Sequence, residues 1–380
     1  YRFHFNIHSL DQETIIYPDS TIYNETAFFF DMYDIILDNS LESEIIWKAR
    51  DGHEITSGFQ LKDVNFNLGM DFGVTTLDTS ILLTPLDMDE DTREIAFFIQ
   101  DKIEVTDKLK VQVGLRGTDY SLHDKLYFDP RLGIKYNWSD NISLKLNWGI
   151  YHQFLTTANN QDENFRLVDL WMGIPEDKDA SQSQHSILGL EYLSPSNIFY
   201  RVEVYKKDFD NLLTLKQVDA FTENENEFQS EPFNEFWDTD AEATGIEFLI
   251  KKSSGRLNGW LGYTFAKSKY YNPQSGCHTP NFDRTHTINR VTSVEINADL
   301  EFSTAVSTST GNPYTPIMGR VYDFSHSLNT STYWYPNDSF LVGEKNSTRY
   351  GDYFRFDIGL TRKHGNLFGL QYDTYWQIMN

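Results

Sequence analysis

Carboxylates at alternate positions are the first candidate for chemistry in this sequence. Residues 87–91 read Asp-Met-Asp-Glu-Asp, and a calcium-binding loop presents its oxygen ligands with this spacing. An EF-hand is excluded, because Thr92 stands where such a loop needs its glycine and Phe98 stands where it needs a bidentate glutamate. The run therefore predicts a looser external calcium site or a solvated acidic loop. The acidic stretch at 223–242 is expected to be solvated or to attract cationic ligands.

The remaining reactive residues give little support for a metal site or for a catalytic nucleophile. None of the 10 histidines forms a pair with metal-ligand spacing on one element, since His4 and His8 would need a helix where the pattern predicts a strand. No Gly-x-Ser-x-Gly motif is present. We expect no catalytic residue, no metal site, no cofactor and no enzyme activity, although a fold does not in itself exclude catalysis.

Aromatic side chains between the predicted strands are the candidates for ligand contact, because recognition needs side chains that are free of the strand ladder. They could stack on a sugar, a catecholate or a peptide ring. The alternative is that the loops pack on their own aromatic residues. The candidates are Trp171, Trp237, Tyr271, Tyr314, Trp334 and Tyr335.

The elements that must position these residues are β-strands, because the hydrophobic period is two. Residues 108–116 alternate Leu and Val with polar residues or Gly, and residues 141–150 follow the same rule. The polar side of these two strands carries Lys110, Gln112, Lys145 and Asn147, which we expect to face a polar lumen. About 17 strands are predicted. Their ranges are 1–8, 26–36, 42–50, 54–70, 92–105, 108–116, 126–137, 141–150, 182–192, 197–207, 211–219, 242–252, 257–269, 284–296, 299–309, 354–360 and 366–379.

The connections between these strands alternate in length. Short polar turns are expected at 51–53, 106–108, 138–141, 194–197, 253–256, 297–298 and 364–366, and long loops at 72–91, 119–125, 154–181, 220–241, 270–283 and 310–351. Short turns on one rim and long loops on the other are typical of an outer-membrane barrel. The chain is thus predicted to be all-β, a single antiparallel up-and-down transmembrane β-barrel segment over residues 1–380. The first 40 residues fit poorly, because 9–25 is too long for a short turn.

Composition agrees with a barrel and excludes other classes. Aromatic residues make up 15% of the chain, and the formal net charge is −24. Such an acidic balance argues against a nucleic-acid groove and against docking on an anionic membrane surface. The longest uncharged apolar run, 95–99, is far shorter than the roughly 18 residues of a membrane-spanning helix.

Several segments resemble TonB-dependent outer-membrane receptors. Residues 94–116 resemble the mid-barrel signature, and 129–153 resemble the hairpin that follows it. The most specific match is the sequence Phe-Asp-Arg-Thr-His-Thr-Ile-Asn at 282–289, followed by Thr-Gly-Asn-Pro-Tyr-Thr-Pro at 310–316. The resemblance covers nearly the whole chain from about residue 26, and its residue style is similar to receptors of Bacteroidota.

The resemblance implies a barrel of about 22 strands closed by a globular plug, in the outer membrane of a Gram-negative bacterium. Such a receptor imports a scarce ligand, for example a siderophore, cobalamin, a glycan or a peptide. Its partners would be outer-membrane lipid and the TonB complex, which acts through a plug segment expected before Tyr1. About five strands would then be missing, with the segment incomplete at both ends.

Two other classes remain open. An outer-membrane assembly or structural barrel needs no TonB contact, and the presence of a plug decides between this class and a receptor. A soluble all-β carbohydrate-binding or propeller protein would purify without detergent.

Overall fold

The computed structural model describes residues 2–16, 27–75, 80–158, 170–215, 236–323, 337–367 and 370–380. All regular elements in these ranges are strands, and the ranges contain no helix that could cross a membrane. The all-β prediction is confirmed.

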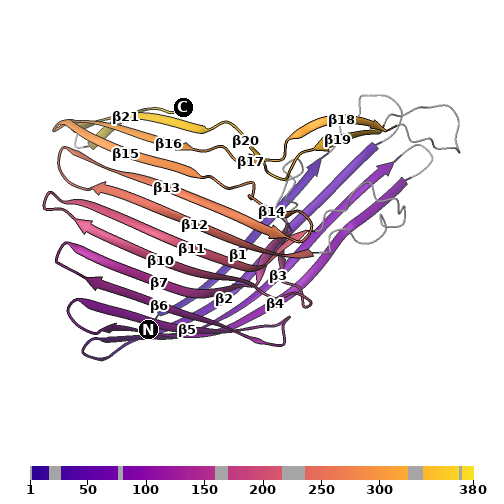
Figure 1. Ribbon diagram of the computed structural model, residues 1–380, viewed down its shortest axis with the longest axis horizontal. Helices are drawn as coiled ribbons and strands as arrows, with labels where there is room; N and C mark the ends of the chain where they lie inside the picture. The colour runs from indigo at the N-terminus through magenta and orange to yellow at the C-terminus, as the bar shows by residue number, and fades with distance from the viewer. Residues whose placement is uncertain are drawn as a thin grey trace. The chain divides into compact units, whose positions relative to one another are not determined.

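Fifteen strands follow one another in a single hydrogen-bonded order, each beside its neighbour in the sequence (Figure 1). Registers from β1 to β7 and from β13 to β22 are antiparallel. These strands are β1 Arg2–Ile16, β2 Ala27–Arg50, β3 His53–Thr75, β4 Ser80–Glu104, β5 Leu109–Tyr120, β6 Leu126–Asn137, β7 Ile142–Gln153, β10 Ser181–Leu193, β11 Ile198–Leu215, β12 Phe236–Lys252, β13 Leu257–Asn272, β15 His286–Asn297, β16 Leu300–Ser309, β21 Tyr353–Leu367 and β22 Leu370–Ile378.

Shorter strands occupy the long connections. They are β8 Leu155–Ala158 with β9 Leu170–Gly173, β14 Gly276–His278 beside β13, β17 Pro313–Tyr314 with β20 Thr348–Arg349, and β18 Ile317–Asp323 with β19 Asn337–Val342. The connections at one end of the long strands are all two to four residues long, and those at the opposite end are longer except for the four residues between β3 and β4. This is the alternation that the sequence predicted.

Two predicted strands, 26–36 and 42–50, are one strand in the structure. The polar residues Asn39 and Ser40 resemble a turn in the sequence, but in β2 they pair with Asp63 and Lys62 of β3, so polar residues face polar residues within the ladder. Because β2 is continuous, the connection from β1 to β2 falls at the long-connection end. The poor fit of the first 40 residues is thereby resolved.

Two further predictions are corrected in the same way. Residues 211–215 of the strand expected at 211–219 are the end of β11, and 216–219 lie outside the described residues, so the count of long strands falls from about 17 to fifteen. The loop expected at 72–91 is mostly strand, because β3 continues to Thr75 and β4 begins at Ser80. The acidic run at 87–91 therefore lies in β4 and not in a loop. Asn65 of β3 donates hydrogen bonds of 3.0 Å to both Asp89 and Asp91.

Two compact units divide the chain. Unit 1 comprises Tyr1–Leu188 with Lys207–Ala241, and unit 2 comprises Gly189–Lys206 with Glu242–Asn380.

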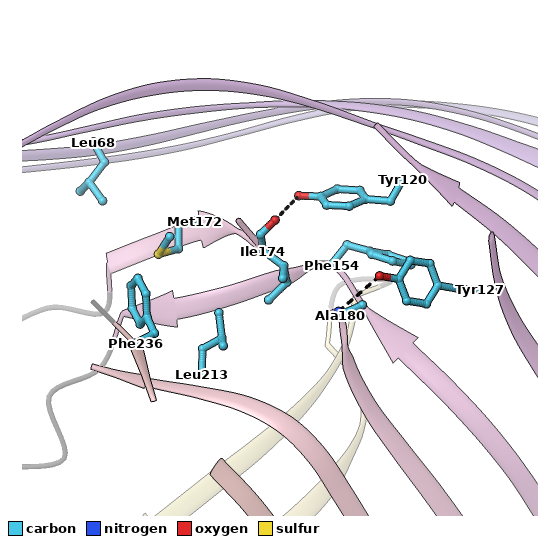
Figure 2. Close-up of a cluster of buried hydrophobic side chains, with 9 residues drawn as sticks. All are labelled: Leu68, Tyr120, Tyr127, Phe154, Met172, Ile174, Ala180, Leu213 and Phe236. Carbon is cyan, nitrogen blue, oxygen red and sulfur yellow. Dashed lines mark hydrogen bonds between the residues drawn. The ribbon is translucent and has the colours of Figure 1, made fainter. Parts of the chain in front are cut away.

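The hydrophobic core of unit 1 lies at the long-connection ends of its strands (Figure 2). Tyr120 stacks on Phe154 with ring centroids 4.8 Å apart, and Tyr127 meets the same ring edge-on at 5.0 Å. Ile174 is completely buried beside them. Full burial of a large apolar side chain contributes roughly 1.5–3 kcal/mol. The cluster comprises Leu68, Tyr120, Tyr127, Phe154, Met172, Ile174, Ala180, Leu213 and Phe236.

Unit 2 carries the long connection from β16 to β21. The two-residue strands β17 and β20 close its base, where Pro313 pairs with Arg349 and Tyr314 with Thr348. Gly311 lies so close to the returning chain that a Cβ atom there would be 2.0 Å from the carbonyl oxygen of Tyr350. Only glycine fits at this position of the Thr-Gly-Asn-Pro-Tyr-Thr-Pro sequence.

Candidate functional site

The long strands of unit 1 present one apolar and one polar face. On the apolar face of β4 and β5, Ile99 is 54% exposed and lies opposite Leu115, which is 45% exposed. On the polar face Gln112 donates to Gln100 at 3.0 Å, and Arg116 donates to Gln60 at 2.6 Å. Exposed large apolar surface marks contact with lipid or another protein. The polar face satisfies its side chains with cross-strand hydrogen bonds.

A concavity of about 790 Å³ lies on this polar face, near the short turns that follow β2, β4 and β6. We call it the short-turn concavity. All four residues predicted to face a polar lumen, Lys110, Gln112, Lys145 and Asn147, line it. Alternation in two strands predicts that they share one face, and whether this face lines a lumen stays a prediction. The lining also contains Lys48, Lys102 and Lys135, which were missed because only the register between strands shows that they share this surface.

The connection between β7 and β10 folds back onto the polar face of unit 1. Its described residues, 154–158 and 170–180, are called the inner strap. Gly173 packs so tightly that a Cβ atom there would be 2.7 Å from the Tyr120 hydroxyl. The Tyr120 hydroxyl also donates to the carbonyl oxygen of Ile174 at 3.4 Å (Figure 2). The strap thus covers the long-connection ends of the strands beneath it.

Trp171, a predicted ligand contact, lies in this strap. Its backbone N–H donates to Asp34 Oδ2 of β2 at 3.1 Å. Asp34 is 1% exposed, and its other oxygen, Oδ1, is buried without a hydrogen-bond partner among the described residues. This contact could not be predicted from the sequence, because its partners are far apart in the chain.

His123, in the turn between β5 and β6, contacts the strap, and His152 of β7 contacts the neighbouring strand β6. His123 Nε2 donates to the carbonyl oxygen of Pro175 at 3.0 Å, and His123 Nδ1 lies 2.5 Å from the Tyr127 hydroxyl. Next to them, His152 Nδ1 lies 2.7 Å from the buried Asp129 carboxylate. Neither histidine was singled out from the sequence.

The other predicted aromatic contacts lie on separate elements. Trp237 and Tyr271 were expected in loops but lie within β12 and β13, because these strands extend beyond their predicted ends. Tyr271 is 42% exposed. Tyr314 lies in β17 and stacks on Tyr350, with ring centroids 4.3 Å apart. Trp334 and Tyr335 lie outside the described residues.

The two most specific sequence motifs meet in unit 2. Arg349 Nη2 bonds Asp283 Oδ2 at 2.5 Å, and Arg349 Nη1 donates to the carbonyl oxygens of Asp283 at 3.0 Å and Gly311 at 3.1 Å. Ser268 N–H donates to the other oxygen, Asp283 Oδ1, at 2.9 Å. We call Asp283, Gly311 and Arg349 the Asp283 clasp. The motifs therefore fasten the long connection to the strands.

Metal ligands are not assembled in the part of the chain that the structure describes. It contains no group of three or more His, Cys, Asp or Glu side chains that could hold an ion.

Similarity to known proteins agrees with the strand order and the two-faced sheet. The sequence model of the family described as "TonB dependent receptor-like, beta-barrel" matches residues 1–373. The chain belongs to this family. The family places the barrel in the outer membrane of a Gram-negative bacterium, and the predicted fold class is confirmed as an antiparallel barrel-type sheet. No curated protein matches the sequence.

Solved structures with the same fold are receptors and transporters. The ferric yersiniabactin uptake receptor FyuA from Yersinia pestis is 12% identical, with a TM-score of 0.58 over 95% of this chain and 51% of that one. The ferric citrate transporter FecA is 11% identical, with a TM-score of 0.57 over 100% and 54%. The RagAB peptide transporter is 9% identical, with a TM-score of 0.56 over 93% and 52%. This receptor barrel chain thus spans about half the length of these three structures.

Proposed function

We propose that this chain forms the barrel wall and external loops of a TonB-dependent receptor, which binds a scarce extracellular ligand and imports it into the periplasm. The observation that carries the proposal is the two-faced sheet of a receptor-family chain. Its apolar face suits outer-membrane lipid, and its polar face suits a passage for a hydrophilic ligand. The receptor binds and gates its ligand in this proposal and performs no catalytic step.

The partners follow from this role. The TonB complex supplies the energy through a plug segment, and outer-membrane lipid surrounds the apolar face. The ligand is a small molecule of the siderophore, cobalamin, glycan or peptide type, which is consistent with ferric chelates and peptides in the names of the similar structures. Lys110, Gln112, Lys145 and Asn147 would form part of the passage wall at the short-turn end.

Ligand capture is assigned to the long connections. Tyr314 is the best supported of the six aromatic candidates, because it is already stacked face to face on Tyr350 in the connection that the Asp283 clasp holds. A ligand ring could extend this stack. Tyr314→Ala should weaken ligand binding by about 0.5–1.5 kcal/mol. Tyr375→Ala, an exposed tyrosine of β22, is the matched control and should leave affinity unchanged.

Loss of the receptor gene tests the proposal against the assembly or structural barrel, which family membership does not favour. Wild-type and deletion cells are given labelled ferric siderophore, cobalamin, oligosaccharide and oligopeptide. The receptor account predicts that the deletion cells fail to accumulate one of these ligands. Normal accumulation of all four, together with reduced amounts of other outer-membrane proteins or of lipopolysaccharide, would support the assembly barrel instead.

A further inference from the structure

One arginine lies on the apolar face of unit 2. Arg290 of β15 pairs in register with Leu261 of β13 and Val306 of β16, and Val306 pairs with Phe356 of β21. Residues directly opposite each other share a face, so Arg290 stands in a row of apolar side chains. Leu261 is 38% exposed and Phe356 is 37% exposed. A charge in a lipid-facing row is unfavourable unless it reaches the membrane interface or an opposite charge.

The protein does not balance the charge of Arg290. On the opposite, polar face, Arg355 of β21 forms an ion pair with Asp357 at 2.8 Å. Arg290 differs, because its Nε donates to Thr292 Oγ1 at 2.9 Å and no carboxylate among the described residues forms an ion pair with it. Its two terminal nitrogens therefore remain available for a partner outside this part of the chain.

Further polar and cationic groups lie on the same face, between Arg290 and the long connections. His286 of β15 pairs in register with Phe265 of β13, and residues two apart on a strand share a face. The Tyr263 hydroxyl lies 2.9 Å from His286 Nδ1. Lys267 Nζ lies 5.6 Å from the centre of the Phe265 ring. Tyrosine suits a membrane interface, because its ring is apolar and its hydroxyl is polar.

Lys267 also lacks a counter-charge in the protein. Lys269, two residues farther along β13, pairs with Glu242 of β12 at 3.7 Å. No described carboxylate forms an ion pair with Lys267. In a chain whose formal net charge is −24, this local excess of positive charge beside an apolar surface is a specific feature. It is complementary to a lipid with apolar chains and an anionic head group.

The position of Arg290 along β15 agrees with contact to a head group. β15 runs from His286 to Asn297 and begins at the long-connection end, so the Cα atom of Arg290 is about 14 Å along the strand from that end. Strands in such barrels are tilted by about 35–45°, which reduces the difference in height to about 10 Å. Long connections lie on the outer side of these barrels. An arginine can extend its charged end along the apolar surface toward the interface.

We propose that Arg290, Lys267 and the Tyr263–His286 pair form a binding site for lipid A, the phosphorylated glycolipid of the outer leaflet. The guanidinium of Arg290 donates to phosphate oxygens, and the ammonium of Lys267 adds a second positive charge. The acyl chains lie along the apolar row below. This inference goes beyond the proposed import, because it depends neither on the imported ligand nor on TonB.

Titration of the intact receptor in detergent with lipid A, read by native mass spectrometry, tests the site. Wild-type protein should bind lipid A about tenfold or more tightly than the same lipid with its phosphate groups removed. Arg290→Gln combined with Lys267→Gln should weaken binding of phosphorylated lipid A by a similar factor and leave binding of the dephosphorylated lipid unchanged. Arg290→Lys keeps a positive charge and should bind more tightly than Arg290→Gln.

Arg362 of β21 provides a matched control at the opposite end of the same face. It pairs in register with Leu300 of β16, six residues before Val306 and on the same side of the strand. Arg362→Gln should therefore bind lipid A as the wild type does. Equal losses for Arg290→Gln and Arg362→Gln would show that any positive charge on the apolar face attracts the lipid, and would overturn the site.

Folding is checked on the same samples by melting temperature without lipid. Because Arg290→Gln removes an unpaired charge from the apolar face, its melting temperature should be equal to or above that of the wild type. Equal affinity of wild-type protein for lipid A with and without phosphate would overturn the proposal without any variant. Wild-type affinity in the double variant would overturn it as well, because Arg290 would then only reach water. Binding of inorganic phosphate as tight as that of lipid A would overturn it in favour of a soluble anion.

Discussion

Arg349 of β20 and Asp283, which lies just before β15, form an ion pair 2.5 Å long in which the carboxylate is buried and the guanidinium is partly exposed. The Asp283 side chain is 3% exposed, and it also accepts hydrogen bonds from Ser268 and Thr285. The pair fastens the connection between β16 and β21 where it leaves and rejoins the sheet. This contact holds the base of the long connection that carries Tyr314.

Removal of Arg349 should destabilise the long connection strongly. Arg349→Ala leaves the Asp283 carboxylate buried without its cation, which typically costs about 3–5 kcal/mol. Limited proteolysis within residues 310–352 should become much faster, while the strands stay intact. The double variant Asp283→Asn with Arg349→Ala should lose less stability than the sum of the losses caused by the two single substitutions. Full additivity would show that the two side chains act independently.

Glycines in the same connection give a matched pair of substitutions. Gly311→Ala places a Cβ atom 2.0 Å from the Tyr350 carbonyl oxygen, whereas a Cβ atom at Gly351 meets nothing within 4 Å. Gly311→Ala should therefore open the base of the connection, and Gly351→Ala should not. Hydrogen exchange of the amides at Gly311 and Tyr350 measures the difference. Equal protection in the two variants would contradict the close packing of β17 and β20.

The inner strap should detach when its closest contact is enlarged. Gly173→Val would bring a side chain against the Tyr120 hydroxyl, which allows only 2.7 Å for the first added atom. We expect faster cleavage within 154–180 with unchanged assembly of the barrel strands. Asp34→Asn keeps an acceptor for the Trp171 N–H and should leave the strap in place. Cleavage of Gly173→Val at the wild-type rate would show that the strap does not pack on this face.

Charge on the two faces of β4 should have opposite consequences. Ile99 is 54% exposed on the apolar face, whereas its neighbour Gln100 bonds Gln112 on the polar face. Ile99→Arg would cost about 2–4 kcal/mol at the bilayer midplane and less near an interface. The amount of folded, heat-modifiable receptor in outer membranes should fall for Ile99→Arg and stay near wild type for Gln100→Arg. If Gln100→Arg lowered the amount of folded receptor and Ile99→Arg did not, the assignment of the two faces would be wrong.

Acid should loosen the β13–β14 hairpin. Burial lowers the pKa of His278 below its ordinary value, and nearby Lys345 lowers it further, although a hydrogen bond to Gly276 opposes both. Because the unfolded histidine binds its proton more readily, the stabilisation is complete above about pH 6.5 and is lost as pH falls toward the folded pKa. The protection factors of the amides at residues 276–283, which correct for the intrinsic pH dependence of exchange, should therefore be smaller at low pH. His278→Gln should remove this pH dependence, and its persistence would exclude His278 as the cause.

The strands could be predicted from sequence because every long strand repeats one rule with a period of two. The rule failed at Asn39 and Ser40, where two polar residues in succession resemble a turn, and only pairing with Asp63 and Lys62 keeps them in a strand. It also ended β3 too early and missed the beginning of β4, because residues 72–91 look loop-like when read without their cross-strand partners.

Residues of the candidate site could be predicted only where the alternation of apolar and polar residues along one strand places a side chain on a given face. Lys110, Gln112, Lys145 and Asn147 follow from two strands, but Lys135 joins their surface through register, which sequence alone does not fix. The partners of Tyr314 and Asp283 lie far along the chain, at Tyr350 and Arg349. The resemblance located these two motifs, and the structure shows what they contact.

Accumulation of the imported ligand in cells with and without TonB tests the central claim most directly. The receptor is produced at equal levels in both strains, and surface binding and uptake are measured separately on the same cells. The account predicts that loss of TonB leaves surface binding unchanged and abolishes accumulation in the periplasm. Equal accumulation in the two strains would contradict TonB-dependent import by this barrel.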